Sequence, residues 1–309
     1  MLKFSVVISV FNKENYIAET LRSVLNQTFT DFEIVILNDG STDNSEAEIL
    51  KFNDPRIKYY SQENQGAAAG RNAAIQKAEN EYIALLDADD YWYPFYLEEQ
   101  KKAIEAFPEE AVFATATQTK KNGRVYNNPY STISSPITPI KVNYFEGSFL
   151  FSLLHSSSTV LHKKVFNKIG MYDPAIKSGQ DTDLYIRIGL EYDVVFSGRI
   201  CAIYIIREKS LFQTSKKIAD KVNFEAYEHL ENNNPGLKKF LDLNRYSLCI
   251  LAKMEGNKEA FQKNLQKIDL ENLSNKQRFL LKQNKTILKY LLKTKNGLEK
   301  LGLRLGTFK

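Results

Sequence analysis

The first 210 residues alternate short runs of β-branched and aromatic residues with stretches of helical periodicity. Residues 4–10 and 32–37 are runs rich in β-branched and aromatic residues and bounded by turn residues, a pattern typical of strands buried on both faces. Between them, apolar residues recur at helical spacing over residues 17–25. Such β-α-β alternation predicts a parallel sheet with right-handed crossovers, and therefore an α/β domain. Ligands of such sheets gather at the carboxyl ends of the strands.

The same two periodicities predict the remaining elements. We expect further strands at residues 57–60, 82–86, 112–117, 158–161 and 194–206, and further helices at residues 66–78, 96–107, 150–154, 165–169 and 179–190. The Asn122-Gly123 pair predicts a hairpin, followed by a long surface loop that extends to residue 142.

Beyond residue 215 the pattern is helical only, which predicts three or four antiparallel helices. We expect an α/β domain at residues 1–215 and a basic helical region at residues 216–309. The first carries 22 basic and 27 acidic residues and the second 20 and 10, so the net charge of +5 hides an asymmetry. A basic surface suits an anionic partner, although a solvated lysine-rich helical face explains it equally well.

Several classes of protein are excluded by what the sequence lacks. Cys201 and Cys249 stand far apart with no metal-binding spacing, so a disulfide framework and a cysteine zinc site are not expected. No apolar run reaches the ~18 residues of a spanning helix, and the apolar start meets Lys13 and Glu14 without a cleavage site. We therefore expect a cytoplasmic protein. The glycine patterns of dinucleotide and P-loop sites are missing too.

Two groups of carboxylates follow predicted strands. Asn38-Asp39-Gly40 ends the second strand, where a carboxylate can accept hydrogen bonds from a base or ribose, or can simply order a βα turn. Asp87, Asp89 and Asp90 end the fourth strand and repel one another unless a cation or hydrogen-bond donors gather them. Hard oxygen ligands plus substrate phosphates favour Mg²⁺ or Mn²⁺ over an ordinary acidic turn.

A third acidic group, Asp181 and Asp183, opens the helix predicted at residues 179–190. These acids either cap that helix or present a general base, and because they lie two residues apart, only one should face a substrate. Arg71 could clamp a diphosphate with its planar guanidinium, or lie on the surface. The three histidines, His155, His162 and His229, show no ligand spacing and are interpreted as structural.

Taken in order, these motifs resemble the family two inverting glycosyltransferases, which have the GT-A fold. The resemblance rests on residues 6–12, 23–28 and 33–43, on Asn64-Gln65-Gly66 through Arg71-Asn72, on Asp87-Ala88-Asp89-Asp90 and on Gly179-Gln180-Asp181. It covers about the first 210 residues and leaves the basic helical region outside. It implies a Rossmann-like, mostly parallel sheet flanked by helices, with an all-helical C-terminal appendage.

The resemblance also implies a division of labour within the donor site. Phe11 and Asp39 would hold the nucleotide base, with the backbone of Val10 nearby, while Arg71 and Asp87 would meet the ribose and the diphosphate. UDP-linked hexoses are the leading expectation for the donor, on the resemblance alone.

Asp89 would bind the divalent cation, and Asp181 would be the base that deprotonates the acceptor. Two departures from the family pattern stand out. Gln180 replaces the usual glutamate before the base, and Arg207 is not followed by the histidine that often contributes to metal or phosphate binding. The second departure puts a third protein ligand to the metal in doubt.

Acceptor recognition is expected to fall to residues after Asp90. Trp92, between Tyr91 and Tyr93, could stack on a sugar face or pack in the core below the site, and Gln180 adjoins the base. The acceptor is expected to be a carbohydrate or a lipid-linked carbohydrate, as in bacterial surface-polysaccharide synthesis.

Residues 276–309 interleave basic side chains with leucines, which predicts a basic amphipathic helix that could lie on the anionic inner face of a membrane. The alternative is a helical pair that covers the catalytic domain or a second subunit in a homo-oligomer. Two rivals to the whole interpretation are a nucleotidyltransferase, which would need a basic phosphate loop near residues 12–15, and a nucleotide-sugar or nucleic-acid binding module without catalysis. The tail has few aromatics among its lysines and no recognisable nucleic-acid motif, so nucleic acid is not an expected partner.

Overall fold

The computed structural model describes residues 2–131, 138–207 and 217–300. The chain divides into two compact units, residues 1–207 and 208–309. The boundary expected at residue 215 falls in 208–216, outside the described residues.

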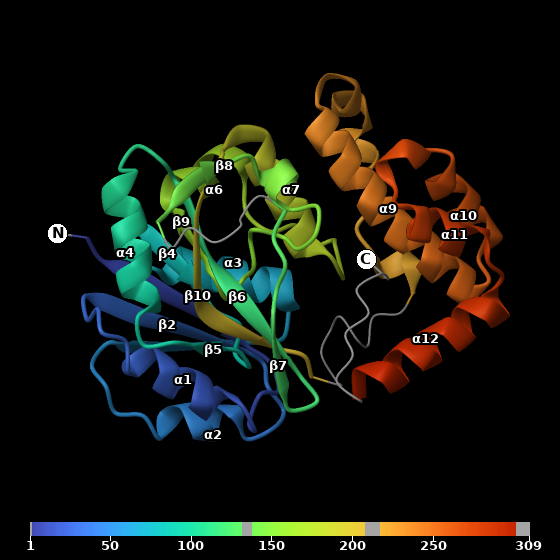
Figure 1. Cartoon of the computed structure of the whole chain (residues 1–309). Coiled ribbons are helices and arrows are strands. Elements are labelled where there is room, and N and C mark those ends of the chain that lie inside the picture. The colour runs from blue at the N-terminus through green and yellow to red at the C-terminus, as the bar shows by residue number, and fades with distance from the viewer. Residues whose placement is uncertain (1, 132–137, 208–216, 301–309) are drawn as a thin grey trace. The chain divides into compact units, whose positions relative to one another are not determined.

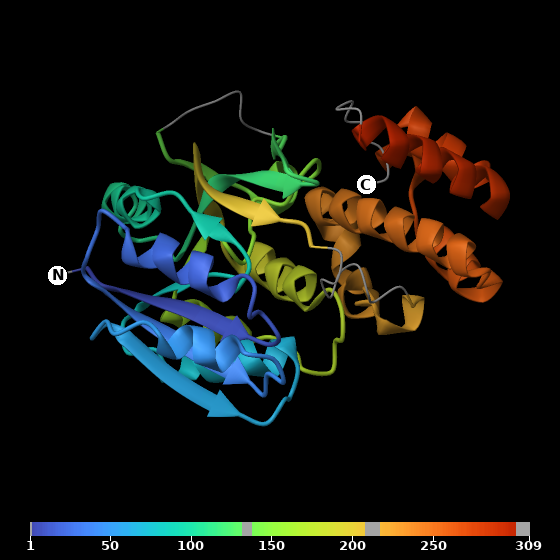
Figure 2. The ribbon, with the colours of Figure 1, turned by 90° about the horizontal axis from the view of Figure 1, so that it is seen from below.

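The first unit is built on a ten-stranded sheet in the order β3-β2-β1-β4-β9-β6-β10-β5, with β7 on β6 and β8 on β10 (Figure 1). The neighbours β3, β2, β1 and β4 are all parallel, and β9 enters antiparallel between β4 and β6. β3 lies at one end of this order, as the view in Figure 2 shows. The strands are β1 Phe4–Val10, β2 Phe32–Asp39, β3 Ile57–Gln62, β4 Tyr82–Leu85, β5 Tyr91–Trp92, β6 Val112–Lys121, β7 Arg124–Asn127, β8 Ile140–Val142, β9 Thr159–His162 and β10 Val194–Ile205.

Helices cover both faces of this sheet. Val6, Ile8 and Val10 of β1 join one buried cluster with residues of α1, whereas α3 packs on the other face of β1 and β2. A Cβ on Gly70 of α3 would come within 2.6 Å of Ser9 Oγ, so glycine allows this helix to approach the sheet closely. The helices of the unit are α1 Ile17–Leu25, α2 Ser45–Leu50, α3 Ala67–Lys77, α4 Tyr96–Ala106, α5 Tyr144–Gly147, α6 Lys163–Ile169 and α7 Gln180–Glu191.

The predicted α/β class is confirmed, and so is the hairpin at Asn122-Gly123, where β6 turns into β7. The helix expected at residues 150–154 is wrong. A four-residue helix, α5, precedes that segment in the chain. The Asn143 side chain caps it by accepting hydrogen bonds from the backbone N–H groups of Phe145 and Glu146. The expected long loop also contains the short strand β8, and its residues 132–137 lie outside the described residues.

The second unit is helical over its described residues, as expected. Its four α-helices are α9 Pro235–Glu255, α10 Lys258–Leu265, α11 Asn275–Lys282 and α12 Lys285–Lys300, and its 3₁₀ segments are η1 Ile218–Asp220, η2 Glu225–Asn233 and η3 Leu270–Asn272. Its apolar cluster joins Tyr246 and Cys249 of α9 to residues of α11 and α12, including Leu288. Both cysteines of the chain are buried and unpaired.

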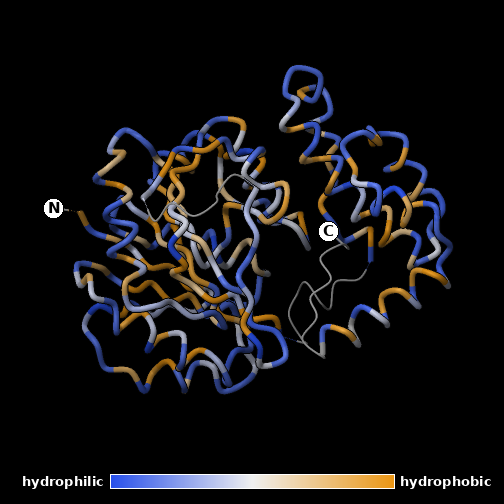
Figure 3. Tube along the Cα trace, in the orientation of Figure 1, coloured by the Kyte–Doolittle hydropathy of each residue, from blue (hydrophilic) through white to orange (hydrophobic). Residues whose placement is uncertain are grey.

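Hydrophobic residues concentrate along the central strands of the first unit, while the helices of the second alternate hydrophobic and hydrophilic segments (Figure 3). Within the described residues, no helix combines the length and the apolar character that crossing a bilayer requires.

Candidate active site

Three predicted site segments follow neighbouring parallel strands. Phe11 comes directly after β1, Asp39 ends β2, and Asp87 comes two residues after β4. Because β1 lies between β2 and β4 and all three are parallel, these segments meet at the same edge of the sheet.

Asp39 is 1% exposed, and its carboxylate is engaged by the chain itself. Oδ1 accepts hydrogen bonds from Gln62 Nε2 (2.7 Å) and from the backbone N–H of Gln65, and Oδ2 accepts from the backbone N–H of Gly66 (2.9 Å). Asp39 therefore fixes the loop that leads into α3. A nucleotide base could reach this carboxylate only by sharing or replacing one of these donors.

Val10 and Phe11 are neighbours in the chain but differ in exposure to solvent. Val10 is fully buried in the sheet, whereas the Phe11 ring is 45% exposed. An exposed aromatic ring at the carboxyl edge of the sheet offers a face on which a planar base can stack.

Arg71 of α3 lies between two of the predicted acids. Its Nη2 donates to Asp87 Oδ1 at 2.6 Å, its Nη1 is 3.5 Å from Asp181 Oδ1, and its guanidinium lies 5.5 Å from the centroid of the Tyr172 ring. Burial opposes the charge, but Asp181 and Asp87 hold the pKa of Arg71 well above its ordinary value. Arg71 thus joins the end of β4 to the start of α7.

Asp87 stays ionised despite its burial. Burial raises its pKa, but the nearby charge of Arg71, followed by that of His155, brings the pKa below its ordinary value. An ionised Asp87 holds the guanidinium in place through a charge-assisted hydrogen bond.

Asp89, the predicted metal ligand, forms an ion pair with Lys13. Lys13 Nζ lies 2.5 Å from Asp89 Oδ2, and the Asp89 side chain is 12% exposed. Arg207 approaches the backbone carbonyl of Asp89, with Nη2 at 3.5 Å. The described residues contain no group of three histidines, cysteines or acids that could hold a metal ion. One carboxylate fits a Mg²⁺ or Mn²⁺ ion that takes its other ligands from water and substrate phosphates.

Asp90 is buried, and its carboxylate accepts hydrogen bonds from other parts of the first unit. Ser157 Oγ donates to its Oδ2 at 2.5 Å, and the backbone N–H of Ile205 donates to its Oδ1 at 2.8 Å. Burial, together with the charges of Asp87 and Asp89, raises its pKa well above the ordinary value. Asp90 therefore ties the acidic turn to β10.

Asp181 stands at the second position of α7, after Gly179, whose φ of 92° places it in the left-handed region. Ser156 Oγ donates to Asp181 Oδ1 at 3.1 Å, and the 3.5 Å contact with Arg71 is to the same oxygen. The side chain is 35% exposed. The partially exposed carboxylate thus joins Arg71 and Asp87 in one cluster.

The neighbours of Asp181 turn away from this cluster. Asp183 pairs with Arg187 on the same helix, with Oδ2 at 2.7 Å from Nη2, so the expected divergence of the two acids is observed. Gln180 is buried, with 4% of its surface exposed, which leaves little of it for an acceptor.

The expectation that Trp92 stacks on an acceptor sugar needs correction. Its ring is fully buried and stacks on Tyr96 with centroids 4.0 Å apart, and its Nε1 donates to the carbonyl of Ser157 at 2.7 Å. Trp92, two residues after Asp90, therefore links the end of the acidic turn to the segment that carries Ser157.

Sequence reasoning missed Lys13 and the serines at 156 and 157. Ser157 Oγ also accepts from the backbone N–H of Asp87 at 3.2 Å, so one side chain orders both ends of the acidic turn. Three consecutive serines before a predicted strand were the available signal. His155, interpreted as structural, accepts from the backbone N–H of Ser157 through Nδ1, and it packs on Tyr204.

Comparison with known proteins identifies the family of the chain. The model of the family described as Glycosyl transferase family 2 matches residues 5–170, more than half of the chain. An uncharacterized glycosyltransferase of Rickettsia conorii is 31% identical over 190 residues, which are 60% of this chain and 31% of that protein. The chain thus spans about a third of that relative. WcaA of Escherichia coli, named for colanic acid biosynthesis, is 29% identical over 201 residues, which are 61% of this chain and 66% of WcaA.

Among solved structures, Staphylococcus aureus TarS 1–349 in complex with UDP-GlcNAc is similar, with a TM-score of 0.68 at 22% identity over 88% of this chain and 83% of that one. The likeness supports the GT-A fold predicted for the first unit. The family match over residues 5–170 covers β1, β2, β4 and the Asp87–Asp90 turn. The chain therefore belongs to glycosyl transferase family 2.

Proposed function

We propose that the chain transfers a sugar from a nucleotide-sugar donor to an acceptor hydroxyl in one displacement that inverts the anomeric carbon. One observation carries the proposal: Arg71 lies within 3.5 Å of both Asp87 and Asp181, which are 94 positions apart in the chain. Acids from distant segments thus meet at the guanidinium of Arg71, at the edge where ligands of such sheets bind.

The donor would lie along this edge. The exposed ring of Phe11 would stack on the base, beside the backbone of Val10, and Asp39 would contribute by holding the loop before α3. Arg71 Nη1 lies 3.5 Å from Asp181 Oδ1, so a diphosphate oxygen would share the planar guanidinium with that carboxylate. Asp87 would keep that guanidinium oriented toward the donor.

Asp89 would hold the divalent cation. When bound, the cation neutralises charge on the departing nucleoside diphosphate. Lys13, 2.5 Å from the same carboxylate, would add a second positive charge on this side of the donor.

Asp181 would be the general base. Both of its contacts are to Oδ1, and within residues 2–131, 138–207 and 217–300 its Oδ2 has no partner. As the acceptor oxygen bonds to the anomeric carbon, its proton passes to Oδ2, and the bond from that carbon to the diphosphate breaks with its electron pair on the leaving oxygen. Arg71 and Ser156 hold the base through the other oxygen, which leaves Oδ2 for the proton.

A UDP-linked hexose is the proposed donor, supported by the similar fold of TarS, which was solved with UDP-GlcNAc. A saccharide of a surface polysaccharide is the proposed acceptor, supported by the name of WcaA. A binding module without catalysis is the rival function, and it would release no UDP from any donor.

The test is UDP release from a panel of UDP-sugars with Mn²⁺, for the parent chain and for Asp181→Asn. We expect Asp181→Asn to lose ~10²–10⁴-fold in turnover, because general-base catalysis contributes that much. Its affinity for UDP, measured by calorimetry, should be retained. Glu191→Gln, at the far end of α7, is the matched control and should keep the parental rate. Parental turnover in Asp181→Asn would show that another group is the base.

For the second unit we propose contact with an anionic membrane surface. From residue 275 to residue 300 the chain has eight basic residues and a single acid, Glu299. Ile287 and Tyr290 of α12 are 40% and 70% exposed, and Lys289 and Lys293 beside them are exposed as well. Exposed apolar side chains flanked by lysines suit the interface between lipid headgroups and acyl chains. Peripheral placement on the inner face of a cytoplasmic membrane would follow.

A further inference from the structure

The second unit contains a pocket of about 340 Å³, formed entirely by its own residues. Its lining comes from three segments of the chain: Arg245 and Leu248 of α9, residues within 218–228, and residues within 257–267. This volume lies within the ~300–1,000 Å³ range of small-molecule sites.

The pocket lining mixes charges of both signs with amides and apolar groups. The cationic residues are Lys221, Arg245, Lys263 and Lys267, the anionic ones are Glu225, Glu228 and Glu259, and the amides are Asn223, Asn257 and Asn264. Two ion pairs join the 218–228 and 257–267 segments: Lys263 with Glu225, and Lys267 Nζ with Glu228 Oε2 at 2.7 Å. Opposite charges therefore nearly balance across the opening.

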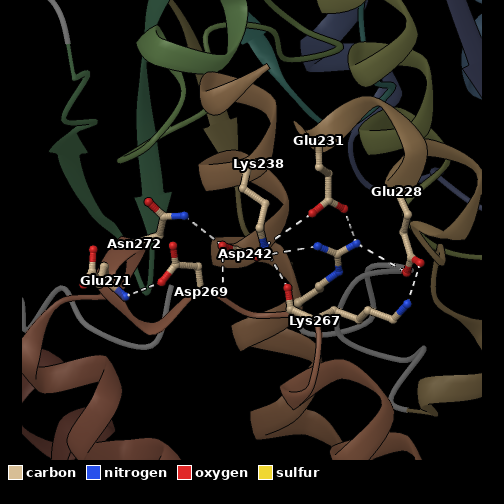
Figure 4. Close-up of polar contacts among 9 residues, drawn as sticks. Glu228, Glu231, Lys238, Asp242, Lys267, Asp269, Glu271 and Asn272 are labelled. Carbon is tan, nitrogen blue, oxygen red and sulfur yellow. Dashed lines mark hydrogen bonds and ion pairs between the residues drawn. The ribbon is translucent and has the colours of Figure 1, made fainter. Parts of the chain in front are cut away.

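An ion network joins three residues of this lining, Arg245, Glu228 and Lys267, to buried acids of the same unit (Figure 4). Arg245, 2% exposed, lies 2.5 Å from Glu231 Oε1 and 3.5 Å from Glu228 Oε1 through Nη2, and 3.5 Å from Asp242 Oδ1 through Nη1. Glu228 thus bridges the buried guanidinium and the partly exposed Lys267. Side chains held in this way are pre-organised for a ligand, because little rotamer freedom is lost on binding.

The composition of the lining selects one class of ligand. A strongly anionic ligand would have to displace glutamates that already hold the lysines, and an apolar ligand would leave charged groups desolvated without partners. Neighbouring hydroxyl groups can donate to carboxylates and accept from ammonium and amide groups at the same time. Val222, Phe224 and Leu248 add apolar surface for the carbon face of a ring.

We propose that this pocket is a second carbohydrate site, which holds a neutral sugar unit of the acceptor away from the reacting hydroxyl. That it holds the acceptor rests on the proposed function; that it binds a sugar rests on the lining alone. A second contact of this kind raises the affinity for longer saccharides through effective concentration, even where each contact is weak.

The test is saturation-transfer NMR on the full chain with the methyl β-glycosides of glucose, galactose and N-acetylglucosamine, in the presence of saturating UDP. Ala260→Phe places a ring into the pocket from α10, where Ala260 is half-buried and belongs to the lining. Gln262→Phe, on the same helix at an exposed position outside the lining, is the matched control. We expect transfer to at least one glycoside in the parent and in Gln262→Phe, and a clear decrease of that transfer in Ala260→Phe.

Transfer that is as strong in Ala260→Phe as in the parent, or no transfer to any of the three glycosides, would overturn the proposal. So would inorganic phosphate binding, followed by ³¹P line broadening, that Ala260→Phe removes while the sugar signal is unchanged. Release of UDP from donor sugars is measured on the same three proteins. Absence of that release in the parent would contradict the proposed function, and the glycoside result would still decide whether the pocket binds sugar.

Discussion

Lys13 Nζ and Asp89 Oδ2 lie 2.5 Å apart although 76 positions separate them in the chain. The lysine follows β1 and the acid follows β4, which are neighbours in the sheet, so the pair forms at the edge proposed to bind the donor. A divalent cation on Asp89 would have to share the carboxylate with this ammonium group. The acid is suited to that role because it is the one member of the Asp87–Asp90 turn whose side chain is engaged neither by Arg71 nor by Ser157 among the described residues.

At this residue scale, Asp89→Asn should weaken the effect of Mn²⁺ on UDP binding. We expect the increase in UDP affinity that Mn²⁺ brings to fall at least about tenfold, the lower end of what losing even an indirect metal partner costs. UDP affinity without metal should stay close to that of the parent, since Phe11 and Arg71 remain. Calorimetry with UDP, with and without Mn²⁺, measures both quantities.

Asp31→Asn provides the control for that measurement, because Asp31 is exposed before β2 and its loss changes the net charge equally. An unchanged Mn²⁺ effect in Asp89→Asn would place the cation elsewhere. A loss of metal-free UDP binding would instead indicate that the substitution disturbs the acidic turn.

At the element scale, the strands and motif acids could be predicted because local signals encode them. β1 and β2 are rich in β-branched and aromatic residues, Asp39 ends β2, and Asp87 comes two residues after β4. The contacts of Ser157 with Asp87 and Asp90 could not be predicted, because they depend on β9 pairing between β4 and β6, some 70 residues later in the chain. The burial of Trp92 depends on the same insertion, since its indole donates to the carbonyl of Ser157.

Helix α9 carries a prediction about stability. Arg245→Met should destabilise the second unit by up to ~3–5 kcal/mol, because it leaves the buried carboxylates of Glu231 and Asp242 to share Lys238. Urea unfolding followed by far-UV circular dichroism would show the shift. Fluorescence of Trp92, the single tryptophan of the chain, reports on the first unit and should keep its midpoint.

Lys263→Gln is the control for this network, since its pair with Glu225 is exposed and exposed ion pairs contribute little to stability. Equal midpoints for Arg245→Met and the parent would mean that the network adds no stability to α9. Methionine preserves much of the volume of the side chain, so a cavity would not account for the loss.

At the scale of the whole molecule, the charge of the chain separates along its length. The net charge is −5 over residues 1–215 and +10 over residues 216–309. The proposed donor site, which would bind an anionic diphosphate, thus lies in an acidic sequence, and it places Lys13 and Arg71 beside the acids of that edge. The surplus positive charge lies in the helical unit, where the exposed residues of α12 offer it to a separate anionic partner.

Sedimentation of the full chain with lipid vesicles tests this partner. We expect binding to phosphatidylcholine vesicles that contain phosphatidylglycerol, and little binding to phosphatidylcholine alone. The double substitution Lys289→Glu with Lys293→Glu should reduce binding at least about tenfold, because each basic residue near an anionic surface contributes about 1 kcal/mol. Lys51→Glu with Lys168→Glu, at exposed positions of the first unit, changes the net charge equally and should bind like the parent.

Binding to vesicles should depend on more than charge if the exposed apolar residues of α12 also enter the lipid. Tyr290→Asp should therefore weaken binding even at a salt concentration that screens the lysines, since burial of an aromatic side chain is insensitive to ionic strength. If the same substitutions leave sedimentation unchanged but convert a dimer to a monomer in analytical ultracentrifugation, the face of α12 binds a second copy of the chain and the membrane proposal is wrong.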